Sequence, residues 1–497
     1  MLATALRIAF LILCLLNSNT HASAADRPNI IFILADDLGW TDLGCQGSRY
    51  YQTPAIDRLA SQGLRFTHGY TCGPNCQPTR AALMSGQYGP RTGVYTVGGT
   101  DRFDWQSRPL KPVGNVTELP LSVRTVANVL QDAGYDTAMF GKWHLGQKDT
   151  HHPSRRGFAE ALVTMGAHYD FKTNPPAEYP EGQYLADFLT DRAVDFISRK
   201  RDRPFFLYLP HFGVHSPHVA KPELVQKFKD LPAHEGHANP VYAAMIASVD
   251  ESVGRILATL DQQGLAENTV VIFSSDNGGV GGYVREGVKA SGDVTDNAPL
   301  RSGKGSLYEG GVRVPWIVRW PGHIPQGVTE SPIISVDLLP TVAELAQAKL
   351  PASQPLDGIS QVECLTSGGA KTPRRDLFWH FPGYLGAGAG QWRTLPAGAI
   401  RSGNWKLLEF FEDQRLELYD LAADPSQQKN LASAEPHRTQ QLHARLIEWR
   451  QAISARMPEL NNSDVTSPSQ PADKAAKKAE KNRAKEKTKG KATAADE

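Results

Sequence analysis

The chain has 497 residues, enough for a full hydrophobic core and more than one domain, and its 40% hydrophobic and 21% charged residues are ordinary for a globular protein. The net charge of +1 conceals an uneven distribution, because nine Lys or Arg and two Asp or Glu lie between Lys474 and Lys491 and leave the rest mildly acidic. A mildly acidic body lacks the basic surface that nucleic-acid binding requires, so we expect no nucleic-acid partner.

Residues 1–25 have the pattern of an export signal that is removed from the mature protein. Arg7 precedes an apolar run at residues 8–16, and Ala22-Ser23-Ala24 supplies small residues for cleavage. The run is too short to span a bilayer as a mature anchor, and no other stretch is long and apolar enough. We therefore expect an exported protein, periplasmic or extracellular, with no stable membrane anchor.

The first element after the signal is a continuous apolar run, residues 28–35, which is suited to a buried parallel strand. It ends in Asp36 and Asp37, and desolvating two adjacent carboxylates without partners costs several kcal/mol each. At the carboxyl end of a central strand they would lie in the usual ligand crevice of an α/β sheet, where hard oxygen ligands favour calcium or magnesium. A solvated turn with a capping aspartate is the alternative.

A cysteine stands at the start of the next notable segment, Cys76–Gly86, where a helix would begin. Arg80 follows four residues later and would offset negative charge, so Cys76 is a candidate activated nucleophile. A buried cysteine packed in a helix-entry turn is the alternative. Four cysteines remain after the signal, too few for a disulfide scaffold, although a bridge between Cys45 and Cys72 is possible.

Three further β-rich runs are each followed directly by polar residues, as the run at 28–35 is. Residues 136–140 lead to Lys142 and His144, residues 205–209 lead to His211 and His215, and residues 269–275 lead to Asp276 and Asn277. Helical stretches such as 121–133 and 241–263 lie between these runs. Alternating strands and helices indicate an α/β fold with a large, mainly parallel sheet flanked by helices.

Lys304 lies in a glycine-rich loop, residues 300–311, before a strand expected at 314–320. The glycines would let the backbone approach an anion closely while the ammonium supplies a point charge. The spacing of this loop is not that of a phosphate-binding P-loop. A solvated loop lysine is the alternative.

The composition changes near Lys349, where prolines and glycines become frequent. We expect an α/β domain at 26–348, a smaller C-terminal α+β domain at 349–460, and a basic low-complexity tail at 461–497. In the smaller domain, residues 399–411 and 416–420 predict antiparallel strands, and residues 436–455 predict a terminal helix. The tail has no apolar residues for a core, so we expect it to be disordered or a transient helix.

The polar motifs follow one another in the order found in a known family. Residues 76–86 resemble the signature C-x-P-[ST]-R-x-x-x-x-[ST]-G of the type I sulfatases, in the alkaline-phosphatase-like superfamily, and residues 134–144 resemble its second signature. Asp36-Asp37-Leu38-Gly39 and Asp276-Asn277-Gly278 look like its metal-ligand motifs, and Lys304 looks like its substrate-side lysine. His215, in Val-His-Ser-Pro, matches the late histidine of the family better than His211 does. The resemblance covers roughly residues 26–450.

The resemblance implies an arylsulfatase-like sulfuric ester hydrolase in which Cys76 is oxidised to formylglycine by a formylglycine-generating or an anaerobic maturation enzyme. It implies one Ca²⁺ per chain, held by Asp36, Asp37, Asp276, Asn277 and the modified Cys76. Arg80 and Lys142 would support the formylglycine, His144 would be the base that helps to expel sulfate, and His215 and Lys304 would hold sulfate and protonate the leaving oxygen. An exported enzyme of this kind suits sulfated carbohydrates, with aryl sulfates as model substrates.

Two alternatives to this function stay open. A phosphomonoester or phosphonate hydrolase of the same superfamily would need more metal ligands, usually histidines placed for a second metal. A non-catalytic relative that binds sulfated glycans would keep Cys76 as a thiol. His380, in the C-terminal domain, either lines a sugar subsite or is a hydrogen-bonded structural histidine.

Overall fold

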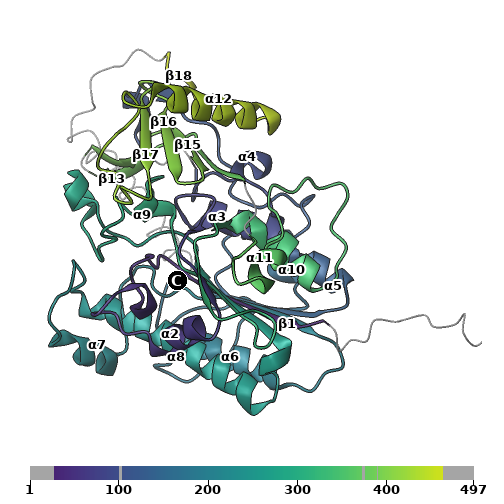
Figure 1. The fold of residues 1–497 in the computed structure, drawn as a ribbon. Coiled ribbons are helices and arrows are strands. Elements are labelled where there is room, and N and C mark those ends of the chain that lie inside the picture. The colour runs from purple at the N-terminus through teal and green to yellow at the C-terminus, as the bar shows by residue number, and fades with distance from the viewer. Residues whose placement is uncertain (1–26, 100–102, 372–374, 389, 463–497) are drawn as a thin grey trace, which may run out of the picture.

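The computed structural model describes residues 27–99, 103–371, 375–388 and 390–462, which form a large α/β body and a smaller C-terminal part (Figure 1). The expected export signal at 1–25 lies outside the described residues, as does nearly all of the expected tail at 461–497. In the described part of the chain, no helix combines the length and apolar character that crossing a bilayer requires.

The body is built on an eight-stranded sheet in the order β10-β2-β9-β8-β1-β7-β5-β6. Its strands are β1 (Asn29–Ala35), β2 (Leu64–Phe66), β5 (Asp136–Gly141), β6 (Glu160–Val163), β7 (Phe205–Pro210), β8 (Thr269–Ser275), β9 (Trp316–Arg319) and β10 (Gly327–Thr329). β8, β1, β7, β5 and β6 pair in parallel, and β9 runs antiparallel to both β8 and β2. The mainly parallel sheet predicted from the sequence is confirmed, with one reversed strand inside it.

Helices cover both faces of this sheet because β1 is apolar on both sides. Ile31 and Ile33 pack in the core beneath α2 (Pro54–Ser61), α6 (Leu185–Ser198) and α8 (Pro240–Gln262). Ile30 and Phe32 pack in the opposite core, beneath α3 (Cys76–Ser85), α5 (Val126–Asp132) and α10 (Leu338–Leu345). Successive side chains of a strand point to opposite faces, so an uninterrupted apolar strand needs two helical layers. Burying each such side chain contributes roughly 1.5–3 kcal/mol.

The C-terminal part is a four-stranded antiparallel sheet in the order β12-β15-β16-β17, covered by the helix α12 (Pro436–Ala452) (Figure 1). Its strands are β12 (Asp376–Phe381), β15 (Ala397–Ser402), β16 (Trp405–Phe410) and β17 (Leu416–Asp420). The run 399–411 holds two strands rather than one because Gly403, at φ 56°, takes a left-handed turn between them. Leu442 and Leu446 of α12 pack against the sheet, and the antiparallel sheet with a terminal helix is confirmed.

Shorter elements complete the chain. They are β3 (Gly69–Tyr70) paired with β11 (Ile333–Ile334), β13 (Leu385–Gly388) with β14 (Gln391–Thr394), β4 (Leu110–Lys111) with β18 (Glu459–Leu460), and the helices α4 (Gly89–Thr92), α7 (Pro222–Lys229), α9 (Glu309–Val312) and α11 (Val362–Thr366). Single 3₁₀ turns lie at Gly44–Gln46, Trp105–Ser107, Asp149–His151, Pro153–Arg155, Ala266–Asn268, Val284–Glu286, Lys289–Ser291 and Ser335–Asp337.

The two parts share a continuous apolar core. Tyr70 and Ala82 of the body lie in one buried cluster with Leu377 and Trp379 of β12. Cys364, on α11, packs into the core of the large sheet although it follows residue 349. The domain boundary at 348/349 stays a prediction.

Candidate active site

The carboxyl ends of β1, β5, β7 and β8 meet at one edge of the large sheet, and the loops that follow them are joined by backbone hydrogen bonds. Asp36 donates its N–H to the carbonyl of Gly213 at 2.9 Å, and Lys142 donates to the carbonyl of Pro210 at 2.8 Å. Asp276 donates to the carbonyl of Ala35 at 3.2 Å. These bonds bring together the polar residues that the sequence places after four separate strands.

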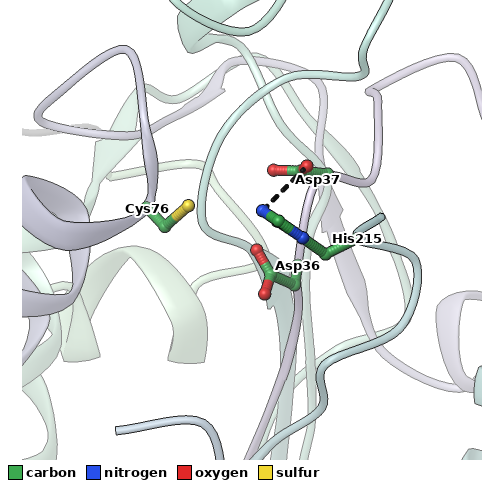
Figure 2. A group of neighbouring side chains, drawn as sticks. All are labelled: Asp36, Asp37, Cys76 and His215. Carbon is green, nitrogen blue, oxygen red and sulfur yellow. Dashed lines mark ion pairs between the residues drawn. The ribbon is translucent and has the colours of Figure 1, made fainter. Parts of the chain in front are cut away.

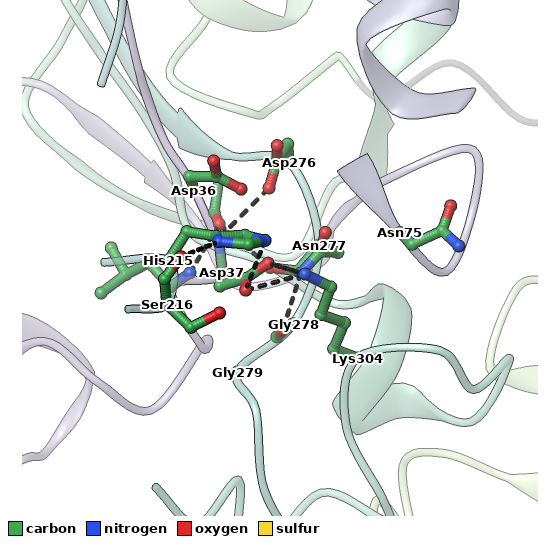
Figure 3. A network of polar contacts seen from close by, with 12 residues as sticks. Asp36, Asp37, Asn75, His215, Ser216, Asp276, Asn277, Gly278, Gly279 and Lys304 are labelled. Carbon is green, nitrogen blue, oxygen red and sulfur yellow. Dashed lines mark hydrogen bonds and ion pairs between the residues drawn. The ribbon is translucent and has the colours of Figure 1, made fainter. Parts of the chain in front are cut away.

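Three carboxylates and one amide form the floor of the site (Figure 3). Asp36, Asp276 and Asn277 are 0% exposed and Asp37 is 2% exposed. Asp37 has φ 68°, a left-handed conformation that turns the chain sharply after β1. Its N–H donates to Asp276 Oδ1 at 3.2 Å, and Asn277 Nδ2 donates to Asp37 Oδ1 at 2.8 Å. So many buried acidic groups require cations close by.

Each carboxylate has a cationic side chain within 2.7 Å. Lys142 Nζ lies 2.5 Å from Asp36 Oδ2, Lys304 Nζ lies 2.6 Å from Asp37 Oδ1, and Arg80 Nη2 lies 2.7 Å from Asp276 Oδ2. Arg80 also donates to the carbonyl oxygen of Lys142 at 2.6 Å, which ties α3 to the loop after β5. Burial alone would raise the pKa of Asp37, but Lys304, His215 and Lys142 outweigh burial and hold it well below its usual range.

Cys76 lies at the first position of α3 and is buried, at 1% exposure. Ligand atoms of Asp36, Asp37, Cys76 and His215 all lie within 4.8 Å of one another (Figure 2). Burial raises the pKa of the Cys76 thiol, but Lys142 and Lys304 outweigh this and hold the pKa well below its usual range. The side chain at position 76 is therefore placed where negative charge is stabilised.

Two histidines lie beside the Cys76 side chain. Burial lowers the pKa of His144, and the neighbouring Cys76 side chain offsets part of this shift. A ring nitrogen of His215 lies within 4.8 Å of the Cys76 sulfur and 3.8 Å from Asp37 Oδ2, and His215 Nδ1 pairs with the carbonyl oxygen of Ser216 at 2.6 Å. Burial lowers the pKa of His215, but Asp37 and Asp36 outweigh burial and raise it to about 9.

His211 does not take this position. It is 0% exposed, and its Nε2 pairs with the hydroxyl of Ser252 on α8 at 3.0 Å. Burial lowers the pKa of His211 to about 4. His215 is thus the histidine of the loop after β7 that lies at the cluster.

The oxygen atoms of the cluster fit a hard divalent cation. Asp36 Oδ1 and Asn277 Oδ1 are buried, and neither has a hydrogen-bond partner among the described residues. Unpartnered buried oxygens are costly, and a cation with oxygen preference such as Ca²⁺ would satisfy them. Asp37, whose carboxylate is shared between Lys304 and Asn277, completes an oxygen-rich set with Asp276.

His380 lies apart from this cluster in the described contacts. It is 7% exposed, and its Nε2 pairs with the carbonyl oxygen of Arg456 at 2.8 Å. Burial lowers its pKa to about 4, and these contacts support the structural interpretation of His380 over a sugar-binding one. Cys45 and Cys72 are both free thiols in the structure, so the possible bridge between them is not formed.

Two supporting side chains were not predicted. Ser275 Oγ accepts the N–H of Leu38 at 3.1 Å and donates to the carbonyl of Asn277 at 3.0 Å, which joins the loops after β1 and β8. Tyr242 on α8 donates to the carbonyl oxygen of Asp37 at 3.1 Å. A serine at a strand end and a tyrosine in an amphipathic helix carry no distinguishing sequence signal, because their role depends on contacts across more than 200 residues.

The chain is similar to known proteins over most of its length. The family model described as "Sulfatase" matches residues 28–348, and the model described as "N-sulphoglucosamine sulphohydrolase, C-terminal" matches residues 303–452. A protein named "Sulfatase" from Formosa agariphila is 35% identical over 500 aligned positions, covering 85% of this chain and 87% of its own length. The N-acetylgalactosamine-6-sulfatase of Mus musculus is 33% identical over 372 positions, covering 70% of this chain and 68% of its own length.

A solved structure is similar over most of the chain as well. The crystal structure of Ps i-CgsB in complex with k-i-k-neocarrahexaose superposes with a TM-score of 0.70 at 30% sequence identity. The match covers 85% of this chain and 92% of that one.

Proposed function

The chain belongs to the type I sulfatase family and is a sulfuric ester hydrolase, and on that premise we propose that it removes sulfate from sulfated carbohydrates, using formylglycine at position 76 and one Ca²⁺. One observation carries the proposal. The side chain of Cys76, at the start of α3, lies beside His144 and within 4.8 Å of ligand atoms of Asp36, Asp37 and His215 in a buried, oxygen-rich cluster. The name of Mus musculus N-acetylgalactosamine-6-sulfatase contains a sulfated sugar, and the structure of Ps i-CgsB was solved in complex with k-i-k-neocarrahexaose. Both support a carbohydrate as the substrate class.

Different residues of the site have different roles in cleaving the sulfate ester. When present, the formylglycine hydrate supplies a hydroxyl nucleophile and Ca²⁺ supplies Lewis-acid stabilisation of the sulfate oxygens. Asp36, Asp37, Asp276 and Asn277 would hold the cation through their oxygens. Lys142 balances negative charge at position 76, and Lys304 balances the charge of the bound sulfate group while the S–O bond breaks.

Proton transfers fall to the two histidines. His144, in contact with the side chain at position 76, accepts a proton from a hydroxyl at that position. His215, on the loop after β7, has a side chain that is 26% exposed, and with Lys304 it serves the leaving oxygen. Arg80 positions both the metal floor, through Asp276, and the loop of Lys142, through its carbonyl.

The mass of the tryptic peptide that contains Cys76, from protein made in its own host, tests the proposal. We expect a loss of about 18 Da relative to the thiol form, as cysteine becomes the aldehyde of this nucleophile class. The same preparation should release sulfate from an aryl sulfate. A thiol in that host, with no sulfate release, would favour the non-catalytic glycan-binding alternative.

The phosphatase-like alternative is less well supported by the donor set. Among the described residues, one group of His, Cys, Asp and Glu has metal-ligand spacing, and it contains a single histidine, His215. A second metal would require a second group of this kind. For the location, we infer export from residues 1–25, and we infer a maturation enzyme as the partner that modifies Cys76.

A further inference from the structure

A cavity of about 570 Å³ adjoins the candidate active site on the side of His144. Gln77, the neighbour of Cys76 on α3, lines it together with His144, and the rest of its wall comes from the loops after α4 and β5 and from residues 163–174. The volume is within the range of pockets that hold small ligands. Apart from His144, the mechanism above uses none of the side chains that line it.

The polar groups of this cavity have unused hydrogen-bonding capacity. Gln147 and Asn174 are exposed, and their side-chain amides form no hydrogen bond to any described residue. Gln77 Oε1 and His144 Nδ1 are buried without a partner in the described part of the chain. A ligand with several hydroxyl groups could satisfy such donors and acceptors together.

The same cavity has an apolar side. Val97, Val163 and Met165 line it, and Met165 is 43% exposed, so part of its apolar surface is open to a ligand. A sugar ring presents hydroxyls at its edge and C–H groups on its face, so it matches a cavity with both kinds of wall.

The charge of the wall restricts which sugar fits. Among the described residues that line the cavity none is lysine or arginine, and the one carboxylate is Glu118. Lys148 Nζ lies 2.9 Å from Glu118 Oε2, but Lys148 is 71% exposed and is not part of the wall. A second sulfate or a carboxylate on the bound ring would lie beside the Glu118 carboxylate, and no lysine or arginine of the wall would pair with it.

The walls are held in place before any ligand binds. Asn115 Oδ1 accepts the N–H groups of Tyr95 and Thr96 at 2.7 and 3.2 Å, and Asn115 Nδ2 donates to the carbonyl of Gly98 at 2.6 Å. Gln77 Nε2 donates to the carbonyl of Thr117. Preformed walls lower the entropy cost of binding and favour one ring shape.

We propose that this cavity binds the sugar ring that presents its sulfate to Cys76, and that this ring carries no second anionic group. The proposal rests on the proposed sulfatase function and adds the class of saccharide unit to it. Glu118 and the amides of Gln147 and Asn174 hold the ring hydroxyls, and Val163 and Met165 cover its apolar face.

The test compares sulfate release from three probes: 4-nitrophenyl sulfate, a neutral hexose monosulfate, and the same hexose with a second sulfate. We expect the wild-type enzyme to prefer the monosulfate to the disulfate. Gln147→Ala and Asn174→Ala should each lower kcat/KM for the monosulfate relative to the aryl sulfate about five- to tenfold, because each loses a ligand hydrogen bond. Glu118→Lys should shift preference toward the disulfate about tenfold.

Gln263→Ala is the matched control, since Gln263 is an exposed glutamine that lines a different pocket, at the amino end of β1. It should leave all three rates unchanged, and thermal melting should show that every variant is folded. Equal rates on the two hexose sulfates, or unchanged ratios in Gln147→Ala and Asn174→Ala, would overturn the proposal while aryl sulfate turnover continues. Absence of aryl sulfate turnover in the wild type would instead contradict the proposed function.

Discussion

Lys406 Nζ and Glu309 Oε1 lie 2.8 Å apart, and both side chains have 0% exposure. Lys406 belongs to β16 of the C-terminal sheet, and Glu309 begins α9, five residues after Lys304. Tyr70 donates its hydroxyl proton to Glu309 Oε2 at 2.8 Å, and Arg401 donates to the Tyr70 oxygen at 2.6 Å. The C-terminal sheet therefore reaches the loop that carries Lys304 through a fully buried ion pair.

Breaking this pair from one side should strongly destabilise the protein. Glu309→Gln leaves the Lys406 ammonium buried without its carboxylate, and we expect a loss of about 3–5 kcal/mol in the free energy of unfolding. Replacing both residues, as Glu309→Gln with Lys406→Met, should recover part of that loss, because the unpaired ammonium is removed while Arg313, 3.7 Å from Glu309 Oε2, still loses its partner. Denaturant unfolding of the two single variants and the double variant measures the coupling directly.

An exposed ion pair of the same residue types serves as the control. Lys371 Nζ and Glu363 Oε1 are also 2.8 Å apart, but their side chains are 67% and 73% exposed. Glu363→Gln should leave the free energy of unfolding nearly unchanged, since solvent screens such pairs. Equal losses at the two sites would show that burial does not strengthen the Lys406–Glu309 pair.

A second prediction concerns stability against pH. Asp250, on α8, accepts the N–H groups of Ile56 and Ala55 at 2.8 and 3.2 Å, yet burial outweighs these bonds and raises its pKa from 3.8 to about 6. A carboxyl with a raised folded-state pKa favours folding while it is protonated. Its contribution is therefore present below pH 3.8 and is lost as the pH rises to about 6.

Asp250→Asn removes this titration. Relative to the wild type, the variant should gain about 3 kcal/mol of unfolding free energy between pH 3.8 and pH 7, since each pKa unit corresponds to about 1.4 kcal/mol. Unfolding of both proteins at pH 4, 5, 6 and 7 gives the difference, in which the titration of all other groups cancels. A constant difference across that range would contradict the raised pKa.

The long central strands could be predicted from the sequence because their apolar runs are uninterrupted. β1 and β8 were expected within one residue of their observed bounds, whereas β2 and β10, with three residues each, have no such run. The antiparallel direction of β9 could not be predicted from the sequence either. Strand direction depends on how a connecting loop crosses the sheet, and residues 300–311 show only that the loop is rich in glycine.

The candidate site was more predictable than its surroundings. Asp36, Asp276 and Lys142 directly follow strands, so the parallel sheet alone brings them to one edge. His380 also lies on a strand, but its partner is a backbone carbonyl 76 residues away, which no local pattern reveals. The same holds for Lys406. In the sequence it is an ordinary strand residue, and only the structure shows that it pairs with Glu309.

Calcium should stabilise the folded protein through the carboxylate cluster. At a free Ca²⁺ concentration 100 times its Kd, we expect about 2.7 kcal/mol of added unfolding free energy relative to the chelated protein. Asn277→Ala removes one unpartnered oxygen, Oδ1, and should weaken this effect. Thermal melting in EGTA and in excess Ca²⁺ measures it, and an undiminished calcium effect in Asn277→Ala would remove Asn277 from the ligand set.

A variant of Lys304 can distinguish a role in substrate binding from a role in shaping the metal site. Its ammonium contacts Asp37 Oδ1 and Oδ2 at 2.6 and 2.8 Å, so in the metal-free site it competes with a cation for the same carboxylate. Lys304→Ala should therefore bind Ca²⁺ at least as tightly as the wild type, because the site becomes more negative. If Lys304 also balances sulfate charge, kcat/KM should fall about 10²- to 10³-fold.

Calcium affinity and kcat/KM, measured together in Lys304→Ala, distinguish a substrate role of Lys304 from a structural role. Lys289→Ala, at an exposed lysine of a neighbouring 3₁₀ turn, is the control and should change neither quantity. Lower turnover with retained calcium affinity in Lys304→Ala assigns the ammonium to the substrate. Lower turnover with lost calcium affinity would mean that Lys304 only shapes the metal site through Asp37. Unchanged sulfate release would take Lys304 out of the mechanism, because a half-buried cation in contact with the reacting charge cannot be removed without cost.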